Sequence, residues 1–177
     1  MRPGLAAALA SVVSLAGARD AAAQSFPNQS RPASGKVLYV GVGAAGLISK
    51  SPGLAGSVVL AIEWEHLLVT GEASLGETFS KWDEFDAGAQ VGAVLLPAED
   101  TPYVLAGIEH RTFADVIDEQ RGRTDVSLTG EAGYLFRRTG ERQVWLGLRG
   151  ILPMSSSVYS ATSPHLPLAV LVLKFLF

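Results

Sequence analysis

From residue 36 to the C-terminus, apolar and polar residues alternate along the chain in segments of about ten residues. In residues 85–95, for example, Phe85, Val91 and Leu95 fall on one face, and Asp86 and Gln90 on the other. A period of two is typical of strands, whose successive side chains point to opposite faces. No stretch after Gln24 holds the apolar spacing of an amphipathic helix. The pattern predicts eight strands, at residues 36–48, 57–66, 69–78, 85–95, 102–112, 124–136, 143–153 and 166–177.

The polar face of these segments is rich in Gly, Ser and Ala, with an occasional Glu or Arg. Such small residues would coat a water-soluble barrel poorly, but they suit the narrow interior of a small barrel. The predicted strands are also long enough to cross hydrocarbon, which takes about 9 to 11 tilted residues. Lipid offers no partner for an open sheet edge, so such strands must close. We therefore expect an all-β fold, a closed eight-stranded antiparallel up-and-down transmembrane β-barrel.

The first residues carry the features of a secretory signal peptide. Arg2 gives a positive start, Leu5 to Gly17 form an apolar run, and Ala21 to Ala23 supply a small-residue cleavage site. The run is shorter than the roughly 20 residues of a membrane-spanning helix. We predict a cleaved signal peptide at 1–23, a flexible Ser- and Pro-rich leader at 24–35 and the barrel at 36–177.

Aromatic residues gather near the ends of the predicted strands, as they do at the two interfaces of membrane barrels. We expect one belt of Trp64, Tyr103, Tyr134, Phe136, Trp145, Phe175 and Phe177, and a second of Phe79, Trp82, Phe85, Phe113 and Tyr159. With both termini on the periplasmic side, the short turns are 67–68, 96–101 and 137–142. The outer loops are then 49–56, 79–84, 113–123 and 154–165.

The last predicted strand, LPLAVLVLKFLF, ends in Phe177 with Phe175 two residues before it, and Lys174 is its only charge. With the signal peptide and the alternation, this strand resembles the small eight-stranded outer-membrane barrels of Gram-negative bacteria, the OmpA- and OmpX-like class. The resemblance implies that Phe175 and Phe177 form the assembly signal recognised by the barrel assembly machinery. It also implies a place in the outer membrane, in contact with lipid and lipopolysaccharide.

Alternation assigns a set of charged residues to the barrel interior. An unpaired, desolvated charge is very costly, so these residues must pair or stay hydrated. Eight strands enclose about enough room for side chains, which favours a salt-bridged plug over a channel. The alternative is a proton- or cation-conducting pore, favoured by the acidic excess. The assigned residues are Glu63, Glu65, Glu72, Asp86, Glu109, Arg111, Asp125, Glu131, Arg149 and Lys174.

Candidate chemistry is sparse elsewhere. The absence of Cys excludes disulfides, thiolate metal sites and Cys nucleophiles, and a net charge of −3 argues against nucleic-acid binding. No metal-ligand spacing or nucleotide-binding motif occurs, so we expect no metal and no cofactor. His66 lies at a predicted turn beside Trp64, where interfacial anchoring explains it, and His165 has no acid near it in the sequence. His110 and Thr112 share a face, as the His and Ser of lipid A deacylases do, but Thr112 replaces the Ser.

We therefore expect no catalysis. The predicted function is that of a monomeric outer-membrane barrel with a structural or surface-interaction role. Its outer loops at 113–123 and 155–163 are polar, and they are the parts most open to lipopolysaccharide head groups or a partner. Three alternatives stay open: a deacylase-like lipid A enzyme, a small ion-conducting pore and a soluble, lipocalin-like ligand-binding barrel.

Overall fold

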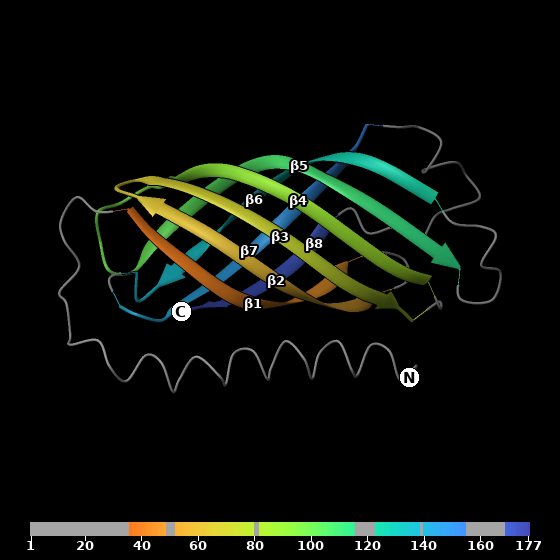
Figure 1. Cartoon of the computed structure of the whole chain (residues 1–177), viewed down its shortest axis with the longest axis horizontal. Coiled ribbons are helices and arrows are strands. Elements are labelled where there is room, and N and C mark those ends of the chain that lie inside the picture. Colours follow the sequence, from red (N-terminus) through yellow and green to blue (C-terminus); the bar gives the residue numbers. More distant parts are fainter. Residues whose placement is uncertain (1–35, 49–51, 80–81, 116–122, 139, 155–168) are drawn as a thin grey trace.

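The computed structural model describes residues 36–48, 52–79, 82–115, 123–138, 140–154 and 169–177. These residues form a closed antiparallel barrel in which each strand pairs with its neighbours in sequence and β8 returns to β1 (Figure 1). The predicted barrel is confirmed. The strands are β1 Lys36–Ile48, β2 Gly53–Trp64, β3 Leu67–Thr78, β4 Trp82–Val94, β5 Thr101–Asp115, β6 Arg123–Phe136, β7 Gln143–Pro153 and β8 Ala169–Leu176.

The described residues include no helix with the length and apolar character needed to span a membrane. The predicted signal peptide and leader lie outside the described residues, as do 116–122 and 155–165 of the predicted outer loops and 166–168 of the predicted last strand. We call the end with Phe177 and the turns after β2, β4 and β6 the turn end, and the opposite end the loop end.

Several predicted boundaries shift. The turn between β2 and β3 is Glu65 and His66, so Leu67 and Leu68, predicted as a turn, belong to β3. Glu65 adopts a left-handed backbone with φ 55°, as a tight hairpin requires. β2 begins earlier than predicted, at Gly53, which pairs with both Leu47 and Thr78. Because glycine has no side chain, it adds no signal to a pattern of alternating hydrophobicity. β4 and β5 likewise extend into segments predicted as outer loops.

Burial follows the alternation closely. In β7, Gln143, Trp145 and Arg149 are buried while Leu146 and Leu148 are exposed. All eight strands expose large hydrophobic side chains on their outward faces. The barrel therefore has an apolar exterior around its whole circumference, far larger than the apolar patches that water-soluble monomers expose.

The interior holds two groups of buried apolar side chains. The larger group lies toward the turn end and contains Tyr39, Val59, Ala61, Leu68, Val94, Tyr103, Leu105, Leu135, Trp145 and Leu176. The smaller group lies toward the loop end on β1, β7 and β8 and contains Leu47, Ile151, Val170 and Val172. Apart from Glu63 at the turn end, the charged interior residues of the strands lie between the larger group and the loop end.

The predicted aromatic belts need a correction. Tyr103 and Trp145, expected at the rim, are each 1% exposed and pack inside with ring centroids 5.0 Å apart. They share the inward parity of Arg111 and Arg149, and this parity outweighs their position near strand ends. The other belt members with described side chains face outward: Trp64, Tyr134, Phe136 and Phe175 at the turn end, and Phe79 and Phe85 at the loop end. The end residue Phe177 is half-buried.

The final residue takes part in closing the barrel. The N–H of Phe177 donates to the carbonyl of Val40 at 3.0 Å, and the N–H of Val40 donates to the carbonyl of Phe177 at 3.1 Å. The β1–β8 ladder has eight residue pairs against twelve for β1–β2, so this extra pair extends the shorter ladder.

Phe177→Ala keeps these main-chain bonds and removes only the ring. If the ring is an assembly signal, the folded protein in cell membranes should fall several-fold, while the purified variant should refold in detergent with normal heat-modifiable migration on gels. Phe136→Ala removes another outward aromatic at the same end and should leave membrane levels near those of the unsubstituted protein. Equal losses in both variants would reduce Phe177 to a general interfacial anchor.

Candidate functional site

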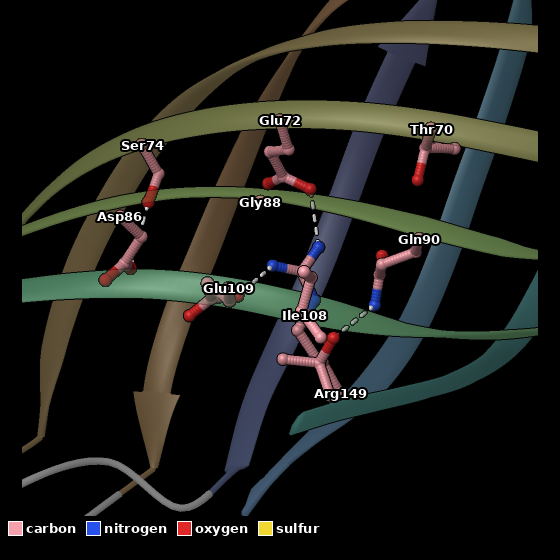
Figure 2. A pocket seen from close by; sticks show the side chains of 10 residues that line it. Thr70, Glu72, Ser74, Asp86, Gly88, Gln90, Ile108, Glu109 and Arg149 are labelled. Atoms are coloured by element: carbon pink, nitrogen blue, oxygen red, sulfur yellow. Dashed lines mark hydrogen bonds and ion pairs between the residues drawn. The ribbon is translucent and has the colours of Figure 1, made fainter. Parts of the chain in front are cut away.

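The candidate site is a layer of charged side chains inside the barrel. Alternate positions on β3 to β8 direct these side chains inward, and most are fully buried. The layer contains six carboxylates and three cations, namely Glu72, Glu84, Asp86, Glu109, Asp125 and Glu131 with Arg111, Arg149 and Lys174. Part of it is drawn in Figure 2.

Arg149 on β7 joins three strands across the lumen. Its Nε donates to Glu131 Oε2 at 2.9 Å, and its Nη1 donates to Glu109 Oε2 at 3.3 Å. Its Nη2 donates to Glu72 Oε2 at 2.5 Å (Figure 2). Because the guanidinium is a planar fork of fixed donors, one Arg can hold carboxylates from β3, β5 and β6 at the same time.

Lys174 and Tyr103 complete the binding of Glu131. Lys174 Nζ lies 2.9 and 3.1 Å from the two Glu131 oxygens and 3.3 Å from Glu72 Oε2. The Tyr103 hydroxyl donates to Glu131 Oε1 at 2.8 Å. We call Glu72, Glu131, Arg149 and Lys174 the balanced cluster, since its two acids face two cations.

Two glycines make room for Tyr103 in this cluster. A Cβ at Gly147 would lie 2.5 Å from the Tyr103 hydroxyl, and one at Gly133 would lie 2.8 Å from it. Both distances are too short for real contacts. The small residues that alternate with the charges on the inward face therefore leave space for the large polar side chains.

Nearer the loop end, Arg111 on β5 is surrounded by acids. Its Nε lies 3.3 Å from Asp86 and 3.1 Å from Glu109, and its Nη2 pairs with Glu84. Asp125 is its cross-strand neighbour on β6. We call Glu84, Asp86, Glu109, Asp125 and Arg111 the acidic cluster. Glu109 of the acidic cluster also contacts the balanced cluster, because its second oxygen accepts from Arg149.

Neutral donors satisfy some of the remaining acceptors. Ser74 Oγ donates to Asp86 Oδ2, and Ser127 Oγ donates to Asp125 Oδ2, both at 3.1 Å. A cavity of about 10 Å³ lies between the clusters, lined by Glu72, Asp86, Glu109 and Arg149 among others (Figure 2). That volume is enough for about one water molecule. Gln90 Nε2 donates to Thr129 Oγ1 at 3.1 Å on the cavity wall.

A separate set of contacts caps the turn end. Arg138 Nε donates to Glu63 Oε1 at 2.6 Å, and Gln143 Nε2 donates to Glu63 Oε2 at 3.2 Å. Trp145 Nε1 donates to Gln143 Oε1 at 2.9 Å. Arg138 also pairs with the carbonyl of Glu65. The cap and the apolar group beside it close the lumen below the balanced cluster.

The structure places nine of the ten residues assigned to the interior on the inward face, with Glu65 as the exception. Glu65 lies exposed in the β2–β3 turn, where strand parity no longer holds. Sequence reasoning missed Glu84, which it assigned to a loop, and Arg138, which it assigned to a turn. Glu84 shares the parity of Asp86, so a longer predicted β4 would have found it. No pattern in the sequence points Arg138 toward Glu63.

The histidines show no catalytic arrangement. His110 is exposed on the outward face, with Ala87 and Val126 as its cross-strand neighbours and Thr112 next on its own strand. None of these neighbours is an acid that could orient it. His66 is exposed in the β2–β3 turn, and His165 lies outside the described residues. Within the described ranges, no group of three or more His, Asp or Glu side chains has the geometry of a metal site.

Comparison with known proteins identifies the fold. No protein-family model and no curated protein sequence matches the chain. Neisserial surface protein A is 13% identical with a TM-score of 0.58, covering 80% of this chain and 97% of that one. The N-terminal β-barrel domain of Pseudomonas aeruginosa OprF is 16% identical with a TM-score of 0.54, covering 78% and 97%. Both are small eight-stranded outer-membrane barrels, and this chain has their fold.

Arg149→Met should strongly destabilise the barrel, because Glu72, Glu109 and Glu131 lose a shared cation. Breaking a buried pair on one side costs about 3–5 kcal/mol. Urea unfolding of the refolded barrel, followed by tryptophan fluorescence, would measure the free energy of unfolding. Arg137→Met, at an exposed turn position, is the control and should change it by at most about 0.5 kcal/mol.

Arg149→Met combined with Glu131→Gln should recover part of the loss, since an acid is then neutralised together with the cation. Comparable small effects of Arg149→Met and Arg137→Met would show that the ion pairs are dispensable for stability.

Proposed function

We propose that the protein is an integral outer-membrane β-barrel with a filled polar interior and a structural or surface-interaction role. The observation that carries this proposal is the inverted distribution of polarity. Buried ion pairs fill the interior, while aliphatic side chains cover the outside of every strand. Hydrocarbon is the solvent that favours this arrangement, and a closed barrel leaves no unpaired strand edge within it.

The ends of the barrel fit two membrane interfaces. Outward aromatic residues lie at the turn end and at the loop end, where amphipathic rings meet lipid head groups. The shared fold of the outer-membrane barrels supports the same location for this chain. We propose that residues 1–23 direct secretion and that the barrel assembly machinery inserts the chain. Lipid and lipopolysaccharide would be its surroundings, and it would act as a monomer.

The filled lumen favours a structural role over conduction. The balanced cluster joins β3, β6, β7 and β8 across the lumen, and the Glu63–Arg138 pair with Gln143 caps the turn end. The proposed role includes no catalysis, because His110 has no partners for nucleophilic chemistry among its neighbours on β4, β5 and β6.

Depth-dependent substitution would test the membrane location. Leu148 lies in the middle of β7 and is 53% exposed, and Met154 follows β7 at the loop end and is 65% exposed. In lipid vesicles, Leu148→Arg should cost about 2–4 kcal/mol of unfolding free energy, and Met154→Arg about 0–1 kcal/mol. A soluble, lipocalin-like barrel would tolerate both substitutions to within about 0.5 kcal/mol, because both side chains would face water.

Planar-bilayer recording distinguishes the structural role from a pore. The purified barrel should produce no single-channel steps beyond rare flickers, because ion pairs and the cap fill the path through it. Stable, repeated steps of one size would favour the conducting alternative. A preparation of a known porin in the same bilayer serves as the positive control.

A further inference from the structure

The ratio of acidic to cationic side chains changes along the lumen. The balanced cluster pairs two acids with two cations, and the cap pairs Glu63 with Arg138. Among the described side chains, the acidic cluster holds four carboxyl groups and one guanidinium, that of Arg111, so its acids outnumber its cations by three. Among the described side chains, Arg149 is the next cation along the lumen, and Glu109 shares it with the two acids of the balanced cluster.

Most of the acidic cluster is buried, with Asp86 the most exposed of its carboxylates. Arg111 is fully buried, and Glu84 and Asp125 are 2% and 4% exposed. Toward the same end of the lumen, β1, β7 and β8 contribute the apolar side chains Leu47, Ile151, Val170 and Val172 and no charge. Burial of three uncompensated negative charges in such surroundings is very costly.

Two carboxyl oxygens in this cluster have no partner. Glu84 Oε2 and Asp125 Oδ1 are buried and receive no hydrogen bond from the protein. The second oxygen of each group is bound, by Arg111 in Glu84 and by Ser127 in Asp125. A buried ionised oxygen without a donor loses its hydration without compensation, so ionisation of both groups is costly in this arrangement.

A proton satisfies these carboxyl oxygens better than a metal ion does. The described residues contain no group of three or more acidic or His side chains with metal-binding geometry. A proton needs no cage of ligands, because protonation turns one carboxylate oxygen into a donor and leaves the neighbouring carboxylates to accept.

We propose that the acidic cluster is a proton-binding site. In the folded barrel at neutral pH, at least one of its four carboxylates takes up a proton from the loop end to become a carboxylic acid. The new O–H donates to an oxygen of a neighbouring carboxylate. On the turn-end side of the acidic cluster, ion pairs join the four residues of the balanced cluster. The Glu63–Arg138 cap closes the turn end. The site therefore stores protons without passing them through the barrel.

The proposal sets the sign of a pH dependence. The unfolded chain leaves its carboxyl groups hydrated and ionised at neutral pH, so the folded barrel binds more protons than the unfolded chain. Stability then falls as pH rises from neutral to alkaline values. Glu84→Gln and Asp125→Asn replace a surplus acid by a neutral group of similar shape, so each should flatten this dependence and raise stability at alkaline pH.

Infrared spectroscopy of the refolded protein tests the site directly. At neutral pH the native protein should show the carbonyl band of protonated carboxylic acids, and Glu84→Gln or Asp125→Asn should reduce it. Glu141→Gln, at an exposed turn position, is the matched control and should leave both the band and the pH dependence unchanged.

Three results would overturn the proposal. The first is the absence of the band from the native protein, which needs no variant and so holds even if a variant fails to fold. The second is a band that persists undiminished in each of Glu84→Gln, Asp86→Asn, Glu109→Gln and Asp125→Asn. The third is a stability that responds to added sodium or calcium chloride but not to pH, which would indicate a metal ion in the cluster.

Discussion

The fold depends on one constraint: charges removed from water must find partners inside the barrel, because the outward faces of its strands are apolar. Arg149 meets this constraint most fully, with ion pairs to Glu72, Glu109 and Glu131 on three other strands. Large polar side chains fit only because small residues alternate with them, as Gly133 and Gly147 do beside Tyr103. The glycines of the polar face therefore provide the space that the interior polar side chains occupy.

The two charged clusters meet this constraint to different degrees. The balanced cluster has as many cations as acids, and it is held by Tyr103 and by the ring of Trp145, whose centroid lies 5.7 Å from Lys174 Nζ. The acidic cluster departs from neutrality, although Glu109 connects it to Arg149. Among the described side chains, matched charge is thus concentrated toward the turn end of the lumen, and acids outnumber cations toward the loop end. Natural proteins tend to break a rule of good packing where a functional requirement exists.

Strand number, topology and the facing of most side chains follow from the alternation, because a period of two leaves each residue only two directions. The same pattern placed Asp86, Arg111 and Arg149 in the interior. The pattern was wrong at strand ends. Glu65, predicted inside, lies in an exposed turn, and Glu84, predicted in a loop, lies inside because β4 is longer than predicted. Contacts across the lumen, such as Glu72 with Arg149, depend on barrel stagger and side-chain reach, which no local pattern encodes. The low identity to barrels of the same fold agrees with a fold specified by polarity more than by particular residues.

Lys174 sits on the last strand, and its acidic partners Glu72 and Glu131 sit on β3 and β6. In a sheet that lacks β8, Arg149 is therefore the one cation of the balanced cluster left to pair with its two acids. Arrival of the C-terminal strand supplies the second cation at the same moment that it joins β1 to β7. Neutralisation of the balanced cluster and closure of the barrel thus occur in one step. Until β8 has been inserted, the barrel lacks both the closing strand pairs and the second cation.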